Sequence, residues 1–301
     1  MAFEDPPCGR FTVCHRNAAR RPRSSADRHH CAVPRKRIAV LFHERQSEEQ
    51  LPLYAIHYLA DVWRAEGVEV VYLFGVREHV PADILVVHVD LSVVPEEYLQ
   101  FAGRYPAAIN AKVKDIRKST LSTLRVTRDS SYRGPVIVKS DLNYAGVPER
   151  VLGQSSGVAT PFGEPADYTV YDRITDVPGR FFDSRDFVVE RFIPERDDGL
   201  YHVRLLDFLG DRYTCVRVAA SHHVVGVASQ VDYQEVAPPP ELFELRRRLK
   251  LDYGKLDYVM HNSRPIVLDV NKTMGAGNVA AADDLRAMRG HRAAGIYSYL
   301  R

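Results

Sequence analysis

Long hydrophobic runs are missing from this sequence of 301 residues: no apolar stretch approaches the ~20 residues that span a bilayer. The start also lacks the apolar segment of a secretory signal, so we expect none. Cysteine is scarce, and three of the four residues (Cys8, Cys14 and Cys31) fall near the start, so no disulfide framework is predicted. Together these absences argue against a membrane partner and favour the reducing cytoplasm.

Charge is unevenly distributed along the chain. Residues 1–37 contain nine Arg and Lys against three acids, a net charge of +6, so the remaining residues carry −4 of the overall +2. Residues 1–36 also lack hydrophobic periodicity and are rich in Arg, Pro and Ser, which predicts a disordered basic tail. The mildly acidic remainder argues against a broad nucleic-acid surface, so we expect no specific nucleic-acid partner.

Strand and helix signals alternate over residues 37–115. Continuous apolar runs at 37–42, 68–74 and 84–89 are typical of buried parallel strands. Apolar residues at helical spacing separate the first two runs. This order predicts a small α/β domain with a parallel sheet. No G-x-G-x-x-G motif follows the first run, so a dinucleotide is not supported there.

Polar residues stand at the carboxyl ends of these strands, among them His43, Glu44, His88 and Asp90. Open α/β sheets bind ligands at that edge, so these residues are candidates for substrate contacts. Ordinary polar strand ends are the alternative, and the commoner case for each residue taken singly.

Two short β-prone runs near the end of the chain are joined by a polar turn that ends at Pro265, a pattern that predicts a hairpin. Residues i and i+2 of a strand share a face, so Asp269 and Asn271 point the same way, and Asp257 can join them from across the ladder. Two carboxylates and an amide oxygen on one face suit Mg²⁺ that carries a phosphate. A solvated face is the alternative, and spacing alone leaves the two interpretations even.

Lysines mark two earlier segments. Lys118 belongs to a basic cluster at a predicted helix start, which can hold phosphate or simply face solvent. Lys139 closes a Val/Ile-rich strand, and a buried ammonium there needs an anionic partner.

Arginines alternate with apolar residues in a further predicted hairpin around Gly210. On a sheet face over a nucleotide, Arg204 and Arg217 could stabilise charge on a transferring phosphoryl group or an acyl phosphate. A structural role in salt bridges is about equally well supported.

In their order, these motifs resemble the ATP-grasp superfamily of carboxylate–amine or carboxylate–thiol ligases, and in particular its peptide and amino-acid ligases. The resemblance covers roughly residues 110–280. It implies a mixed α/β and α+β fold in which two α+β subdomains, residues 116–185 and 186–301, clasp ATP. A small α/β domain with a parallel sheet, residues 37–115, would precede them.

The resemblance also implies how the nucleotide is held. Lys118 would contact the α-phosphate, with Lys114 as the second choice, and Lys139 would be the second nucleotide lysine. Asp197 would accept the ribose hydroxyls, with Glu195 and Asp198 as rivals. The segment that reads the adenine edge would be Glu190, Arg191, Phe192 and Ile193.

The same resemblance makes Asp257, Asp269 and Asn271 the ligands of two Mg²⁺ ions, for which Mn²⁺ could substitute. It implies an ATP- and Mg²⁺-dependent ligase that forms an amide or peptide bond through an acyl phosphate and releases ADP and phosphate. Its partners would be a small-molecule carboxylate and an amine, amino acids or peptides among them, and a homodimer is allowed. Residues 140–165 are the expected lid. The alternative is a regulatory ATP-binding module that keeps the fold without turnover.

Overall fold

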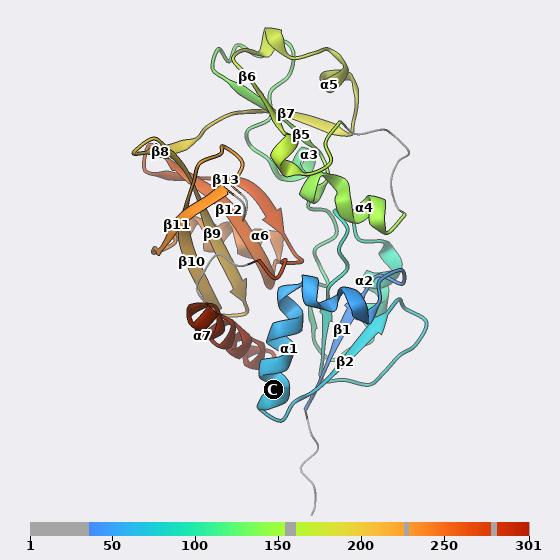
Figure 1. The fold of residues 1–301 in the computed structure, drawn as a ribbon. Helices are drawn as coiled ribbons and strands as arrows, with labels where there is room; N and C mark the ends of the chain where they lie inside the picture. The colour runs from blue at the N-terminus through green and yellow to red at the C-terminus, as the bar shows by residue number, and fades with distance from the viewer. Residues whose placement is uncertain (1–35, 154–160, 226–228, 278–281, 301) are drawn as a thin grey trace, which may run out of the picture. The chain divides into compact units, whose positions relative to one another are not determined.

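A computed structural model describes residues 36–153, 161–225, 229–277 and 282–300 (Figure 1). The predicted basic tail lies outside these residues except for Lys36. All the described residues belong to one compact unit. Within the described ranges, no helix has the length and apolar character needed to cross a membrane.

The first region is built on a parallel sheet with the strand order β2-β1-β3-β4, which confirms the predicted sheet type. Alternate residues of β1 serve two cores, because β1 is covered on both faces. Ile38 packs with α1, and Ala39 packs with α2. The elements are β1 (Arg37–Phe42), β2 (Glu69–Phe74), β3 (Ile84–Val87), β4 (Ala108–Ile109), α1 (Ala55–Ala65) and α2 (Glu96–Ala102).

The helical segment that was predicted between the first two strands is divided in two. A 3₁₀ helix, η1 (Glu48–Leu53), contains Pro52, and the extended residue Tyr54 separates it from α1. Proline disfavours a continuous α-helix because it removes a donor and crowds the preceding turn. The chain therefore bends above the carboxyl edge of the sheet before α1 begins.

The second region carries an antiparallel sheet in the order β6-β5-β7. Its strands are β5 (Val136–Ser140), β6 (Thr169–Tyr171) and β7 (Phe187–Arg191). Strand β7, which begins just after the expected boundary between residues 185 and 186, pairs with β5 and so belongs to this sheet. Its short helices are α3 (Lys118–Leu121), η2 (Asn143–Gly146), α4 (Val147–Val151), η3 (Pro165–Asp167), η4 (Ile174–Asp176) and α5 (Arg180–Asp183).

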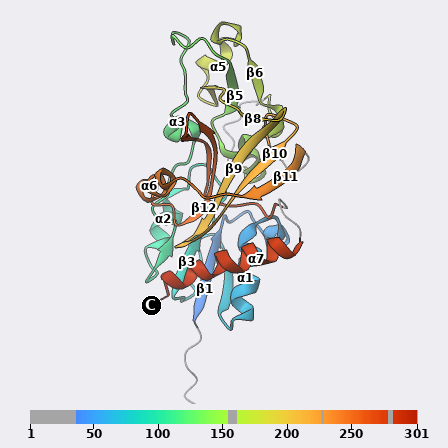
Figure 2. The same ribbon diagram turned by 90° about the vertical axis from the view of Figure 1, so that its left-hand side faces the viewer.

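The third region is an antiparallel sheet in the order β11-β10-β9-β12-β13, with β8 paired to β9. The helix α6 (Pro240–Leu249) packs Leu242 on one face of the sheet, and α7 (Ala282–Ala293) packs Met288 on the other (Figure 2). The strands are β8 (Glu195–Asp197), β9 (Leu200–Leu209), β10 (Arg212–Ala220), β11 (Gln230–Glu235), β12 (Tyr253–His261) and β13 (Arg264–Asn271), and η6 (Ala294–Ser298) follows α7.

Asn110 joins the first sheet to the third. It follows β4 in a left-handed conformation, with φ 59°, and is buried. Its side-chain amide donates to the carbonyl oxygen of Tyr253 at 2.7 Å and accepts from the main-chain N–H of Asp252 at 2.9 Å. Asparagine tolerates this backbone conformation better than most residues, so one side chain both makes the turn and binds the start of β12.

His88 directly follows β3 and is shielded from solvent. It is fully buried between aromatic rings, including Phe42 and Tyr54 at centroid distances of 4.9 Å. Neither ring nitrogen has a hydrogen-bond partner among the described residues. Burial, together with the nearby charge of Lys272, lowers the pKa of His88 to about 3. The imidazole is therefore neutral in the folded protein.

We predict that His88→Phe flattens the pH dependence of stability. The unfolded imidazole binds a proton below its ordinary pKa of 6.5, whereas the buried ring stays neutral down to about 3. Native stability is thus fully present above pH 6.5 and falls toward pH 3. Between about pH 7 and 5.5 the loss in unfolding free energy should be about 1 kcal/mol smaller in His88→Phe. Urea unfolding at several pH values measures the free energy of unfolding, and the exposed His261→Phe is the control. Equal slopes of that free energy against pH in the parent protein and in His88→Phe would contradict the prediction.

Candidate functional site

The hairpin of β12 and β13 brings two carboxylates face to face. Asp257 pairs directly with Asp269, and Lys255 pairs with Asn271 two residues along. Directly opposed residues of an antiparallel ladder share a face, so these four side chains lie on one side of the sheet. A Cβ at Gly254 would collide with the carbonyl oxygen of Asn271, so glycine permits this close approach.

Burial and charge act against each other at this carboxylate pair. Burial, reinforced by the neighbouring Asp269, raises the pKa of Asp257 to about 6, although Lys255 opposes the shift. The ammonium of Lys255 lies 3.0 Å from Oδ1 of Asp257. Burial would lower the pKa of Lys255, but the carboxylates of Asp257, Asp207 and Asp269 outweigh it and raise it. The site therefore concentrates negative charge that only nearby cations can balance.

Lys118 reaches this hairpin from α3. Its Nζ lies 3.3 Å from Oδ1 of Asp269 and donates to the carbonyl oxygen of Leu142 at 3.1 Å, and the residue is 5% exposed. Asp141, which follows β5, holds the start of α3: its carboxylate accepts from the main chain and the hydroxyl of Ser119 at 2.6 and 2.7 Å. The second and third regions thus meet at a lysine–aspartate ion pair.

The segment after Asp141 has an unusual backbone. Tyr144, Ala145 and Gly146 have φ values of 45°, 55° and 73° in succession. Left-handed conformations cost free energy in residues with a Cβ, and such strain is concentrated at functional sites. This segment lies in the expected lid, 140–165, whose residues 154–160 are outside the described part of the chain.

Lys139 is paired with Glu190. Its Nζ lies 2.8 Å from Oε2 of Glu190, whose side chain is fully buried. The two residues come from adjacent strands, β5 and β7. The pairing supplies the anionic partner that the sequence demanded of a lysine at the end of a buried strand.

The predicted adenine segment begins inside β7 and continues past its end, where successive main-chain N–H groups donate to different segments. The main-chain N–H of Arg191 donates to Leu124, and that of Phe192 donates to Pro135, both at 2.9 Å. No hydrogen bond joins the main chain of Ile193 to a residue that the structure describes. An available N–H and carbonyl at this point could read the edge of a purine.

The three candidate ribose acids differ in their contacts. Glu195 accepts from Arg204, from Arg217 and from the main chain of Met260, so its oxygens are engaged. Asp197 is exposed and lies 3.2 Å from Arg217. Asp198 occupies a left-handed turn position, with φ 47°. Asp197 therefore keeps the most accessible carboxylate on β8.

Arg204 and Arg217 lie on the other face of the third sheet. Leu205 is opposite Asp257 in the β9–β12 ladder, and Arg204 is opposite Tyr258, so Arg204 faces away from the carboxylate pair. Arg217 pairs with Arg204 across β9 and β10 and shares its face. Both arginines contact Glu195 at 2.9 Å, which is the structural alternative considered for them.

Lys255 and Asp207 belong to the site although no motif singled them out. Lys255 is two residues before Asp257, and this i, i+2 spacing is the signal that could have revealed it. Asp207 is opposite Lys255 in the β9–β12 ladder and accepts from Arg292 of α7 at 2.5 Å. That contact joins distant parts of the chain and has no local sequence signal.

Asp257, Asp269 and Asn271 fit Mg²⁺ by their chemistry. They offer carboxylate and amide oxygens, the hard ligands that this ion prefers, and the ion pair with Lys255 is the contact that Oδ1 of Asp257 makes in the described residues. The described residues contain no group of three or more His, Cys, Asp or Glu placed to hold a metal. The donor set thus depends on the amide of Asn271 and on oxygens from outside the chain, such as phosphate.

Comparisons with known proteins give no match to a protein-family model or to a curated protein. Among solved structures, the chain is similar to a D-alanine–D-alanine ligase from Bacillus anthracis, with 15% identity and a TM-score of 0.50 over 88% of this chain and 96% of that one. It is also similar to the ATP-grasp ligase PsnB, with 10% identity and a TM-score of 0.49 over 88% and 97%. A third similar structure, a RimK domain ATP-grasp protein from Sphaerobacter thermophilus, has 14% identity and a TM-score of 0.46 over 88% and 98%.

At these identities the likeness concerns the fold and leaves activity to be argued from the site. The parallel first sheet is followed along the chain by the small antiparallel second sheet and the larger antiparallel third sheet. The chain has the ATP-grasp fold.

Proposed function

We propose that this protein is an ATP- and Mg²⁺-dependent carboxylate–amine ligase. The observation that carries the proposal is the contact between Lys118 and Asp269 beside Asp257. It brings a cation of the second region next to two potential metal ligands of the third. A triphosphate with its metal needs both kinds of group within reach. The ATP-grasp fold supports the proposal, since it is shared with a ligase.

The second region would hold the nucleotide. Lys139, positioned by Glu190, would bind phosphate oxygens, and the main chain of Ile193 would read the adenine edge. Asp197 would accept the ribose hydroxyls, because its carboxylate is the accessible one on β8. Lys118 would exchange its contact with Asp269 for the α-phosphate when the nucleotide enters.

The hairpin would hold the metal. Asp257, Asp269 and Asn271 would ligate Mg²⁺, two ions with Mn²⁺ as a substitute, and the bound metal would neutralise the triphosphate. We assign the stabilisation of the transferring phosphoryl group to Lys255 and not to Arg204 or Arg217, because Lys255 lies on the same face of the sheet as the two carboxylates.

Two bond exchanges make up the proposed reaction. An oxygen of the substrate carboxylate attacks the γ-phosphorus, and the bond from that phosphorus to ADP breaks, which gives an acyl phosphate and ADP. An amine then attacks the acyl carbon, phosphate leaves, and the amine loses a proton as the amide forms. Lys255 would stabilise the negative charge that develops on the phosphoryl oxygens. A lid over the site would protect the acyl phosphate from water.

The substrates would be a small-molecule carboxylate and an amine, with amino acids and peptides as the first candidates. A cytoplasmic location and a homodimer stay predictions.

We predict that Asp269→Asn weakens Mg²⁺-dependent ATP binding at least about tenfold, because one charged ligand is lost. Isothermal titration calorimetry with ATP, with and without Mg²⁺, measures the change. Asp211→Asn, an exposed change of the same kind in the β9–β10 turn, should bind like the parent protein. Equal Mg²⁺-dependent affinities for all three proteins would rule out this metal site.

Catalysis is tested by the fate of labelled oxygen. With an ¹⁸O-labelled carboxylate and an amine, released phosphate should carry one ¹⁸O atom, because the attacking oxygen stays on phosphorus. Lys255→Met should lower kcat by about 10²–10³ with a much smaller change in ATP affinity, as expected for a group that stabilises developing charge. A chain that binds Mg-ATP but releases no ADP with any acid and amine pair would be a regulatory module instead.

A further inference from the structure

The carboxylate pair is one end of a row of charged side chains on the face of the third sheet that α7 covers. Asp207 of β9 is opposite Lys255 of β12, and Lys255 is two residues before Asp257. Directly opposed residues, and residues i and i+2 of one strand, share a face. Arg292 reaches the row from α7, with its Nη1 2.5 Å from Oδ2 of Asp207. The sign of the charge therefore alternates along Arg292, Asp207, Lys255 and Asp257.

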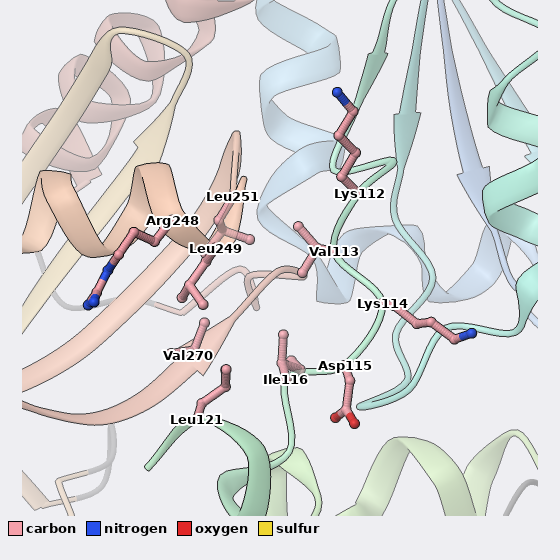
Figure 3. Close-up of a pocket in the computed structure, with 10 residues that line it drawn as sticks. All are labelled: Lys112, Val113, Lys114, Asp115, Ile116, Leu121, Arg248, Leu249, Leu251 and Val270. Carbon is pink, nitrogen blue, oxygen red and sulfur yellow. The ribbon is translucent and has the colours of Figure 1, made fainter. Parts of the chain in front are cut away.

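The opposite face of the hairpin is apolar behind this row. Val270 follows Asp269 in β13 and so points to that opposite face. Figure 3 shows Val270 beside Leu249 and Leu121, in a pocket whose centre is apolar. A partner for the ammonium of Lys255 must therefore come from the face that carries the row.

Asp207 uses only one of its two carboxylate oxygens. Oδ2 contacts Arg292, whereas Oδ1 is buried and has no hydrogen-bond partner among the described residues. A carboxylate oxygen that is buried without a partner costs free energy, so its place in the protein needs a reason. The pairing with Arg292 accounts for Oδ2 and leaves Oδ1 unexplained.

Lys255 has two acidic neighbours and is paired with one of them. Its Nζ lies 3.0 Å from Oδ1 of Asp257, and no ion pair joins it to Asp207, although the structure describes both residues. Burial would lower the pKa of Lys255, but the charges of Asp257 and Asp207 outweigh it and raise it. Asp207 is thus close enough to act on the ammonium without yet contacting it.

The proposed metal site would take Lys255 away from its present partner. When Asp257 ligates Mg²⁺, its carboxylate carries a divalent ion beside the ammonium, and the two cations repel each other. We propose that Asp207 is a positioning residue, which accepts the ammonium of Lys255 on Oδ1 when Asp257 turns to the metal. Lys255 then stays on the face of the carboxylates, beside the transferring phosphoryl group. This inference rests on the proposed function, because it assumes the metal hairpin.

Arg292 holds Asp207 in place for this exchange. Arg292 is 5% exposed, and the carbonyl oxygen of the next residue, Ala293, accepts from Nε1 of the buried Trp63 at 2.8 Å. The end of α7 is therefore tied to α1. A hydrogen-bonded partner outside a site fixes the orientation of the side chain that acts in it. Oδ2 of Asp207 is held in this way, and Oδ1 is left for Lys255.

The first test is a double-mutant cycle on Mg²⁺-dependent ATP binding, measured by isothermal titration calorimetry with the full chain. Asp207→Asn should weaken Mg-ATP binding at least about tenfold, because Lys255 then keeps Asp257 and competes with the metal. In the Lys255→Met background the same substitution should change the affinity by less than about twofold, because the cation that Asp207 receives is gone. Asp211→Asn is the control and should change the affinity in neither background.

The second test needs no substitution at position 207, so it also applies if Asp207→Asn does not fold. Crystal structures of the parent protein with and without Mg-ATP should show the ammonium of Lys255 move from Asp257 to within about 3 Å of Oδ1 of Asp207. An unchanged ion pair with Asp257 in the complex, or equal losses of affinity in both backgrounds of the cycle, would overturn this inference alone. Failure of the parent protein to bind Mg-ATP would overturn the proposed ligase as well.

Discussion

Repulsion between Asp257 and Asp269 is the constraint on which the site depends. The β12–β13 register places the two carboxylates opposite each other, and burial raises the pKa of Asp257 to about 6. Such a pair persists only where cations balance it. Lys255, on the same strand face, and Lys118, from α3, lie 3.0 and 3.3 Å from its oxygens. A divalent ion would satisfy the same need with higher charge.

The cations come from parts of the chain that are far apart, so the fold must hold these parts together. Asp141 anchors α3 to the end of β5, which sets the position of Lys118. Asn110 ties the first sheet to the start of β12, two residues from Lys255. The lysine–glutamate pair of Lys139 and Glu190 lies inside the second region. Each region thus contributes a group whose place is set by buried polar contacts.

Local patterns were enough to predict several elements. The apolar run 37–42 coincides with β1, and the turn before Pro265 separates β12 from β13 as expected. The shared face of Asp269 and Asn271 follows from the two-residue period of a strand, which needs no tertiary information. The parallel α/β sheet of the first region was likewise accessible, because strand and helix signals alternate over residues 37–115. The ATP-grasp fold itself was expected from the family resemblance of the later motifs.

Features that depend on distant pairing could not be obtained in this way. The face of Arg204 is set by the register of β9 against β12, and a shift of one residue would reverse it. The sheet that contains β7 depends on pairing with β5, a strand about fifty residues earlier, so the expected boundary near residue 186 stays a prediction. The link from Arg292 to Asp207 joins α7 to β9, and neither residue carries a motif.

Metal-directed cleavage of the backbone tests the central claim most directly. Fe²⁺ can replace Mg²⁺ beside bound ATP, and with ascorbate and peroxide it cuts the chain next to its ligands. The account predicts ATP-dependent cuts at two places, beside Asp257 and between Asp269 and Asn271, located by mass spectrometry. Cuts at other positions only, or cuts at these positions that do not depend on ATP, would contradict it.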